Sequence, residues 1–215
     1  MDLLQNSAHF YEKLTQSTYT FVLGSKSKKQ YHFTIRAKSE NFPHLVGLDK
    51  LKDITTIFQS KEKFSKKDGV LKRITEGSLK LEDLKKSSFL KSSSDFGIEE
   101  RISFLPLITE IFEEGTSNSN VNFEFLKEKA YSKVDANYLL RVRKEVNGKP
   151  CFLNFFIKKD KYSDYYIPIS FFPHKENRYE KNLQRLTLLY KCQNAEAVEK
   201  KELYKHQNFS LDSLE

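Results

Sequence analysis

The chain has 215 residues, which is long enough to bury one substantial core, and its 18 Phe and 11 Tyr supply large side chains for that core. The longest apolar run, Cys151–Ile157, is too short to cross a bilayer, and residues 1–7 lack the basic and apolar regions of a signal peptide. We therefore expect a cytoplasmic protein without a membrane partner. The formal net charge is +8, and two basic stretches, 50–91 and 141–191, flank the acidic stretch 95–135. Such segregation attracts a phosphate backbone, although lysine-rich surfaces also serve solubility.

The N-terminal half is expected to combine helices with one hairpin. Residues 3–15 keep their apolar side chains on one helical face, and residues 19–23 and 30–37 have the pattern of two strands. From residue 41 to residue 58 the apolar positions recur every three or four residues, which predicts a helix, and Gly47 within it indicates a kink or a close approach of the backbone. We expect a lysine- and serine-rich arm of small helices over 60–94 and an amphipathic helix over 98–112 that continues past Pro106.

The C-terminal third contains four strand-like runs, at 137–146, 150–158, 165–172 and 185–192. The dipeptide Asn147-Gly148 predicts a two-residue turn between the first two runs, which sets the register of that hairpin and pairs Arg141 with Asn154. Pro168 has no amide donor, so the third strand must lie at an edge or carry a bulge, and an edge position leaves Ser170 accessible. Residues 195–206 are expected to form a helix, and residues 208–215 a frayed tail.

The hairpin register separates two faces of the sheet. One face is apolar and must belong to the core; it carries Tyr138, Leu140, Val142, Leu153, Phe155 and Ile157. The other carries Arg141, Arg143 and Asn154 beside Phe152 and Phe156. Paired arginines, an amide and aromatic rings suit a nucleotide, which makes the three polar residues candidates for substrate binding. The alternative is a solvated sheet face on which the arginines extend into water.

These elements predict an α+β fold with helices, an N-terminal hairpin and four C-terminal strands. We expect a single domain over 1–192, followed by a C-terminal helix and tail over 193–215. The sequence lacks the glycine-rich phosphate-binding motifs and the Cys/His spacings of zinc sites. Cys151 and Cys192 lie in apolar runs and are expected to be buried free thiols, and we expect no metal and no cofactor.

The segment Phe42-Pro-His-Leu-Val-Gly-Leu-Asp-Lys-Leu-Lys-Asp-Ile54 resembles the fourth subtype of the phage-associated barnase/EndoU/colicin/RelE-like (PBECR) nucleases. Three further segments support the resemblance and follow in the expected order: Arg101-Ile-Ser-Phe, Ala136-Asn-Tyr-Leu-Leu and Ile167-Pro-Ile-Ser-Phe-Phe. Together the four segments span roughly residues 19–192. Members of this family occur in phages and integrative elements of Gram-positive bacteria.

The resemblance implies a barnase/EndoU/colicin/RelE-like fold, in which the helices and the N-terminal hairpin pack on a C-terminal four-stranded antiparallel sheet meander. It also implies a metal-independent attack on RNA, in which a ribose 2′-hydroxyl attacks its own phosphate. Such chemistry needs a base, an acid for the leaving oxygen and cations for the crowded phosphorane. By motif, His44, Lys50 and Arg101 would perform or assist the transfer, and Ser170 would contact a phosphate or base. We expect Arg141, Arg143 and Arg185 to hold phosphate.

Each candidate also has a purely structural interpretation. His44 follows Pro43 at a helix start, where a histidine often only caps or packs. Lys50 is six residues further on, about 240° around an ideal helix, so the two side chains share a site only if Gly47 breaks the helix. Arg101 follows two glutamates and could form an ordinary surface ion pair with them.

The leading hypothesis is a metal-independent RNase-like toxin or phage effector that acts on RNA in a host bacterial cell, with a protein inhibitor or a host defence protein as a further partner. One alternative is a non-catalytic phage protein that binds and inhibits a host defence complex, which a missing His/Glu pair at the site would favour. A second alternative is a DNA-binding accessory protein of a mobile element. The sequence does not determine the oligomeric state.

Overall fold

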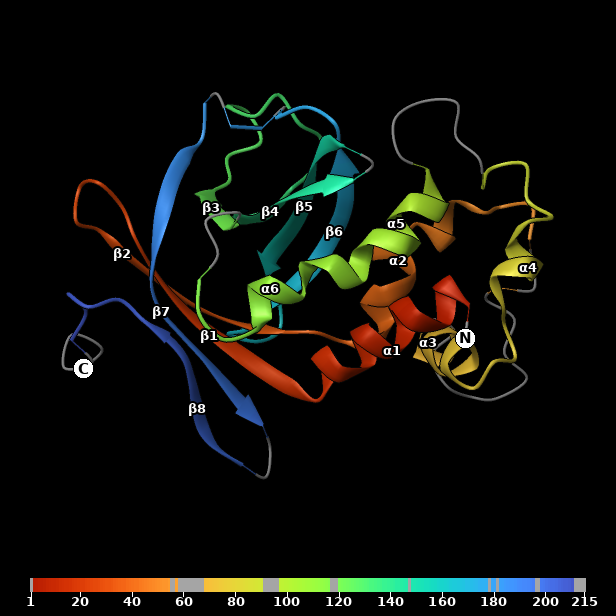
Figure 1. The fold of residues 1–215 in the computed structure, drawn as a ribbon, viewed down its shortest axis with the longest axis horizontal. Helices are drawn as coiled ribbons and strands as arrows, with labels where there is room; N and C mark the ends of the chain where they lie inside the picture. Colours follow the sequence, from red (N-terminus) through yellow and green to blue (C-terminus); the bar gives the residue numbers. More distant parts are fainter. Residues whose placement is uncertain are drawn as a thin grey trace.

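The structure is a computed structural model that describes residues 2–54, 57, 68–90, 97–116, 120–146, 148–177, 179–180, 182–195 and 198–210. It has an α+β fold in which short helices lie beside one large sheet (Figure 1). The helices are α1 (Leu3–Thr15), α2 (Phe42–Val46), α3 (Asp68–Thr75), α4 (Leu81–Leu84), α5 (Ile98–Phe104) and α6 (Thr109–Phe112), with short 3-10 turns η1 (Ser39–Asn41), η2 (Leu48–Lys50) and η4 (Leu105–Ile108). The strands are β1 (Ser17–Gly24), β2 (Gln30–Arg36), β3 (Asn120–Glu124), β4 (Tyr138–Val146), β5 (Lys149–Lys159), β6 (Tyr166–His174), β7 (Gln184–Ala195) and β8 (Val198–Lys205).

The sheet has eight strands in the order β1-β2-β6-β5-β4-β3-β7-β8, so the expected four-stranded antiparallel meander is wrong. β1 also pairs with β7, which closes a circuit of seven strands. The sheet is mixed because β2 and β6 are parallel, joined at Ile35 and Tyr166, while the other pairings are antiparallel. Alternation along the sequence identifies strands but not their partners, and here the N-terminal hairpin is part of the same sheet as the C-terminal strands.

The structure confirms two predictions about the C-terminal strands, the register set by the Asn147-Gly148 turn and the bulge at Pro168. The β4–β5 hairpin pairs Val146 with Lys149 and Arg141 with Asn154, as a two-residue turn requires. Gly148 has a φ of 71°, while Asn147 lies outside the described residues. Opposite Pro168 the β5–β6 register shifts between Phe156 and Ile157, which is the expected bulge.

Three expected helices differ from the structure. The helix over 98–112 is interrupted by the 3-10 turn η4, because Pro106 cannot donate to the preceding turn. The helix over 41–58 ends at Gly47. Residues 198–205 are not a helix but strand β8, because pairing with β7 overrides the helical propensity of this Lys- and Glu-rich segment. Residues 60–67 and 91–94 of the expected arm, Phe58 and the tail from 211 lie outside the described part of the chain.

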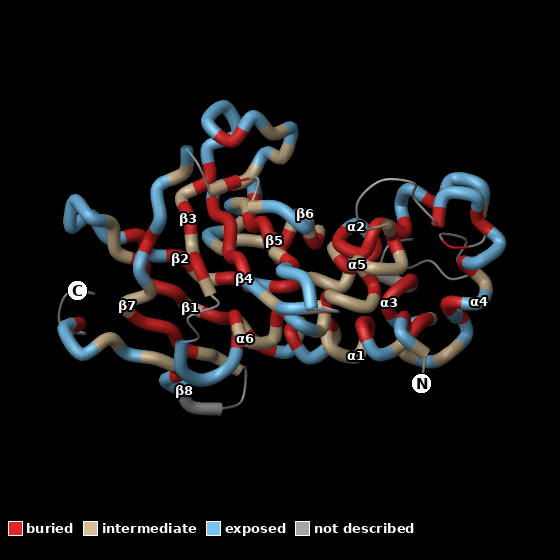
Figure 2. Tube along the Cα trace, turned by 45° about the horizontal axis from the view of Figure 1, so that its top comes forward, coloured by how far each residue is buried: buried red, intermediate tan, exposed pale blue. Residues whose placement is uncertain are grey.

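Both faces of the C-terminal strands are covered. The expected core face is buried, including Leu140, Leu153 and Phe155. The opposite face was expected to be accessible, either as a nucleotide-binding surface or as a solvated face. That is wrong, because a second apolar cluster covers it, made of Val121, Phe123, Phe125, Ala130, Leu139, Phe156 and Tyr179. Buried segments accordingly run through β4 and β5 in Figure 2. The chain segments that follow β3 and β6 supply part of this cover.

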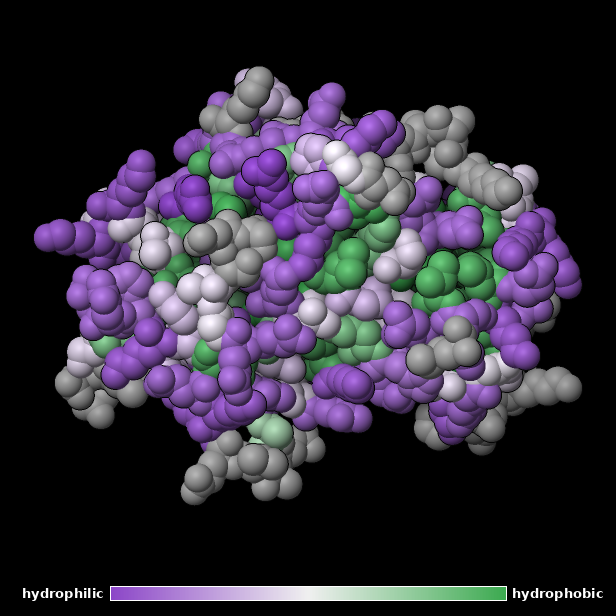
Figure 3. Space-filling view, viewed as in Figure 1, coloured by the Kyte–Doolittle hydropathy of each residue, from purple (hydrophilic) through white to green (hydrophobic). Residues whose placement is uncertain are grey.

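The surface is predominantly polar. In the view of Figure 3, hydrophilic side chains cover most of the molecule and apolar side chains show between them near the helices. Among the described helices, none is long and apolar enough to span a membrane. Cys151 and Cys192 are both buried and free, as expected.

Candidate active site

A glycine separates the two halves of the motif segment. Gly47 has φ 83° and ψ 18°, a left-handed conformation that ends α2 and starts η2. A side chain here would also meet the neighbouring helix, since an added Cβ would lie 3.2 Å from Cγ1 of Ile98. Because the helix breaks at Gly47, the structural condition for His44 and Lys50 to share a site is met: both act electrostatically on Asp49, which lies between them in sequence.

The clearest contact of the site joins His44 and Asp49. Nδ1 of His44 lies 2.6 Å from Oδ2 of Asp49, and the imidazole remains 56% exposed while the carboxylate is 35% exposed. Burial alone would raise the pKa of Asp49, but the hydrogen bond and charge of His44, together with Lys50, lower it below its usual value. An ionised Asp49 accepts the Nδ1 proton of a neutral imidazole, which leaves the Nε2 lone pair for an incoming proton.

Two cations flank this pair. Burial and the positive charge of Arg101 lower the pKa of Lys50, while Asp49 opposes that shift. Burial likewise lowers the pKa of Arg101, against the effects of Asp49 and Tyr179. The Arg101 guanidinium stacks over the ring of Phe172 on β6, 5.6 Å from its centroid. Among the described side chains no ion pair joins Arg101 to Glu99 or Glu100, so the local surface-pair interpretation is not what the structure shows.

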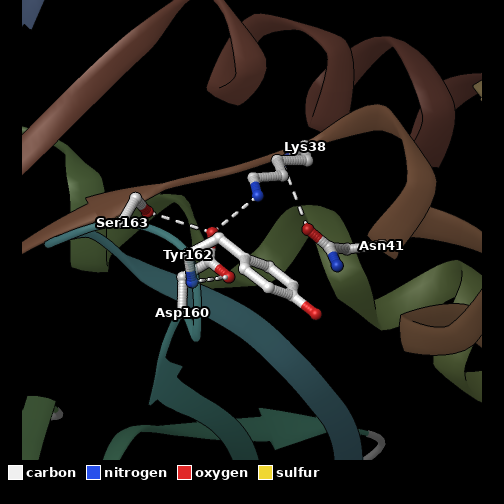
Figure 4. A network of polar contacts seen from close by, with 5 residues as sticks. All are labelled: Lys38, Asn41, Asp160, Tyr162 and Ser163. Atoms are coloured by element: carbon white, nitrogen blue, oxygen red, sulfur yellow. Dashed lines mark hydrogen bonds and ion pairs between the residues drawn. The ribbon is translucent and has the colours of Figure 1, made fainter.

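The segment that carries His44 is fixed by packing and by a polar network. α2 and α5 both pack against β6, the strand whose Phe172 meets Arg101. Upstream, Lys38 Nζ lies 2.7 Å from Oδ2 of Asp160, which also accepts from Ser163 at 3.0 Å (Figure 4). The Lys38 amide donates to Oδ1 of Asn41 at 3.3 Å. These bonds tie the β5–β6 turn to the chain that immediately precedes α2.

The other residues expected to bind substrate do not join this cluster. Arg141 is 4% exposed, donates to Asn177 and Glu180, and lies between the rings of Phe123 and Phe152. Burial lowers the pKa of Arg141 and Glu180 opposes the shift.

Asn154 is 2% exposed and donates to the carbonyl oxygens of Phe152 and Phe172. Neither Arg141 nor Asn154 lies on an open face, contrary to expectation. Arg143 on β4 and Arg185 on β7 are exposed, and Ser170 on β6 is half-buried opposite Phe156. A binding role for these three residues stays a prediction.

Sequence reasoning missed Asp49, the residue around which the site is organised. A signal was present, because Asp49 lies inside the motif segment beside Lys50. An ideal helix would turn a residue five positions from His44 to another face, and only the break at Gly47 makes the contact. Phe172 and Tyr179 come from strand and loop positions distant in sequence, and no local pattern connects them with Arg101.

A histidine oriented by a carboxylate next to a lysine and an arginine is an acid–base site suited to an anionic, phosphate-containing substrate. Among the described residues, no group of three His, Cys, Asp or Glu side chains could hold a metal ion. The family model described as phage-Barnase-EndoU-ColicinE5/D-RelE like nuclease4 matches residues 3–208, and the chain belongs to this nuclease family. No curated protein and no solved structure matches the chain.

Proposed function

We propose that the protein is a metal-independent endoribonuclease in which His44, Asp49, Lys50 and Arg101 form the active site. The observation that carries this proposal is the 2.6 Å contact between His44 and Asp49 beside two partly buried cations. The site holds two cationic side chains, Lys50 and Arg101, against one carboxylate. An incoming phosphodiester would therefore be attracted, and it would stabilise cations that burial now disfavours.

In the proposed reaction, His44 Nε2 takes the proton of a ribose 2′-hydroxyl. The 2′-oxygen then attacks the adjacent phosphorus, and the bond from phosphorus to the 5′-oxygen breaks, which yields a 2′,3′-cyclic phosphate and a 5′-hydroxyl. Lys50, whose pKa is lowered, donates the proton that the leaving 5′-oxygen needs. Arg101 pairs with the non-bridging oxygens, where negative charge builds up in the transition state.

Asp49 and Phe172 position these groups. Asp49 holds the imidazole in the tautomer that presents Nε2 as the base, and the ring of Phe172 supports the plane of the Arg101 guanidinium. Arg143 and Ser170 are proposed to contact parts of the RNA away from the cleaved phosphate. Arg141 and Asn154, which are buried and hydrogen-bonded inside the protein, are left out of this role.

The decisive experiment is cleavage of total RNA and transfer RNA by the purified protein in excess chelator, next to a His44→Ala variant. We expect discrete fragments ending in 2′,3′-cyclic phosphate from the unmodified chain and none from His44→Ala. His32→Ala is the matched control, because His32 is an exposed histidine on β2 whose imidazole hydrogen-bonds to Gln30. Intact RNA with the unmodified protein, or equal cleavage by His44→Ala, would refute the proposal.

A modified substrate tests whether the protein cleaves RNA through the ribose 2′-hydroxyl. An oligonucleotide with a single 2′-deoxyribose at the cleaved position should resist cleavage, since the nucleophile is missing. If the all-DNA strand were cut equally well, the mechanism would be wrong and the DNA-binding alternative would gain support.

A role as a toxin or effector in the host cell extends the same proposal. Induced expression of the unmodified chain should arrest bacterial growth and fragment RNA, whereas His44→Ala should do neither. Growth arrest that persists in His44→Ala would favour the non-catalytic alternative, a protein that blocks a host defence complex by binding. The presence of the His44–Asp49 pair supports the catalytic alternative, because a docking surface does not require an oriented imidazole.

A further inference from the structure

The turn between β5 and β6 presents an aromatic ring to solvent. Tyr162 is 85% exposed, and no large apolar side chain in the described part of the chain is more exposed. A single exposed apolar side chain is common on protein surfaces and by itself indicates no function. The contacts of the turn, the charges beside the ring and the attachment of the turn to the active-site segment give Tyr162 a role.

The backbone of this turn is held by the carboxylate of Asp160, which is 8% exposed. That carboxylate accepts from Lys38 Nζ at 2.7 Å, from Ser163 Oγ at 3.0 Å and from the Tyr162 amide at 3.4 Å (Figure 4). The Asp160 amide donates to the carbonyl oxygen of Tyr165 at 2.8 Å. The hydrogen bonds from Lys38 and Ser163 lower the pKa of Asp160, so the carboxylate stays ionised at neutral pH. A backbone fixed in this way loses little entropy when a partner binds the exposed ring.

Two cations lie beside tyrosine rings of the turn. Lys161 Nζ lies 5.4 Å from the centroid of the Tyr162 ring, and the Arg36 guanidinium lies 5.4 Å from the centroid of the Tyr165 ring. Both cations are exposed, and neither forms an ion pair with a described carboxylate. A nucleotide can use both kinds of group, because its base stacks on a ring and its phosphate pairs with a cation.

The other charges around the turn largely cancel. Lys38 pairs with Asp160 at 2.7 Å, and Lys159 pairs with Asp164 at 3.2 Å. Glu40 is the remaining carboxylate of the two chain segments that meet here. The positive charge that is free to attract a phosphate is therefore concentrated at the two tyrosine rings.

The turn is attached to the segment that carries the candidate active site. Lys38, which binds Asp160, donates its amide to Oδ1 of Asn41 at 3.3 Å, and Asn41 is the residue before α2 (Figure 4). His44 is the third residue of α2, about 4.5 Å further along the helix axis at ~1.5 Å per residue. A single strand of RNA with one phosphate at His44 can therefore extend to the turn.

The chemistry of this surface fits RNA better than a protein partner. Protein interfaces depend on anchoring side chains at the centre of a well-packed patch. The other exposed large apolar side chains lie in other segments of the chain: Leu3, Phe89, Leu107, Leu126 and Tyr131. A lone ring flanked by a cation matches the stacking platforms that bind single-stranded nucleic acid.

We propose that the β5–β6 turn is a second RNA-binding site, in which an unpaired base stacks on Tyr162 and an adjacent phosphate pairs with Lys161. Arg36 pairs with a phosphate further along the strand. This site rests on the proposed endoribonuclease function and adds affinity away from the reacting atoms. Because every base has a face that can stack, the turn favours single-stranded RNA without selecting a particular base.

The test is RNA binding in the His44→Ala background, where the strand stays intact, measured by fluorescence anisotropy with a labelled single-stranded oligonucleotide and with a labelled dinucleotide. Adding Tyr162→Ala should raise the dissociation constant for the oligonucleotide about tenfold, whereas Tyr162→Phe keeps the ring and should bind like the parent. The dinucleotide is too short to reach the turn and should bind equally well in both variants. Lys161→Gln should weaken oligonucleotide binding and reduce its dependence on salt. Tyr131→Ala is the matched control, because Tyr131 is 83% exposed and lies outside the turn.

Two results would overturn the proposal. Unchanged oligonucleotide binding in Tyr162→Ala would leave the turn as a surface for a protein partner, and an equal loss of dinucleotide binding would show that Tyr162 acts on the fold. In the chain that keeps His44, Tyr162→Ala should raise KM for the oligonucleotide and leave the single-turnover rate at saturation unchanged. RNA binding that depends on Tyr162 without any cleavage would refute the endoribonuclease function and leave this site standing. Cleavage with normal binding by Tyr162→Ala would refute this site alone.

Discussion

Replacing Asp49 by Asn tests the mechanism most directly. The change keeps the size of the side chain but removes the charge that orients His44 through the 2.6 Å contact. Hydrogen bonds to charged groups are about twice as strong as neutral ones, so the imidazole would lose its preferred tautomer and orientation. A residue that orients a functional group through a hydrogen bond typically contributes about 10-fold to about 100-fold to activity. Replacing the aspartate by asparagine in the buried triad of a serine protease lowers the catalytic rate about 10⁴-fold.

The expected magnitude follows from exposure. Because His44 is 56% exposed and Asp49 is 35% exposed, water screens the pair, and the lower range applies. We expect Asp49→Asn to lower the single-turnover cleavage rate about 10-fold to about 100-fold, which corresponds to about 1.4 to about 2.7 kcal/mol of transition-state stabilisation. Loss of the carboxylate also removes the anion that faces Lys50 and Arg101, so RNA binding should stay equal or tighten.

The assay is single-turnover cleavage of a labelled RNA oligonucleotide in excess chelator. Binding of the RNA by increasing protein concentration is measured separately, so that the cleavage rate is compared at saturation. Asp164→Asn is the matched control, because Asp164 is a fully exposed aspartate that forms an ion pair with Lys159 on the surface. A rate within twofold of the unmodified protein, or a defect confined to RNA binding, would refute the role of Asp49. Retained cleavage in His44→Ala would refute the mechanism as a whole.

Three further predictions concern the structure that supports the site. Gly47→Ala should destabilise the protein by about 1 kcal/mol in urea denaturation and reduce cleavage, because φ is 83° and the new Cβ approaches Ile98. The control is Gly115→Ala, where φ is 76° and a new Cβ would have no atom within 4 Å. It should show the same loss of stability but normal cleavage. Arg141→Ala should lower the free energy of unfolding by about 3 kcal/mol, since it leaves Glu180 and Asn177 without their buried partner, and an effect near zero would restore Arg141 as a candidate RNA contact. Burial lowers the pKa of Lys191 to about 8 in the folded protein, against 10.5 in the unfolded chain. Between these pH values the unfolded chain binds more protons, so the free energy of unfolding should rise with pH by about 3 kcal/mol across that window. The rise should be absent in Lys191→Met, and identical pH profiles of stability for the two proteins would contradict the prediction.

Local sequence patterns predicted the elements whose causes are local. The amphipathic stretch 3–15 is helix α1, and Asn147-Gly148 set the β4–β5 register. Pro168 produced a bulge, and the recurrence of apolar residues identified one buried face of the C-terminal strands. The resemblance of the motif segment to the PBECR nucleases is confirmed by the family match.

Tertiary contacts decided where the elements lie. The short strand β3, flanked by polar residues, and the strand β8, with its helical composition, were not predicted, because pairing with β7 stabilises both. The second face of β4 and β5 carried arginine and asparagine, which suggested exposure. Segments distant in the sequence cover that face, and they hydrogen-bond the terminal nitrogens of Arg141 and the amide of Asn154.

The candidate site shows the same division. The sequence by itself determined that His44, Gly47 and Lys50 stand in one short segment and that glycine there permits a break in the helix. Only the tertiary structure decided that Asp49 meets His44 and that Arg101, from a helix some fifty residues away in sequence, joins them over Phe172 of β6. The physical reason is that turns and caps depend on neighbouring residues, whereas a charge cluster depends on which distant surfaces pack together, and no local pattern contains that information.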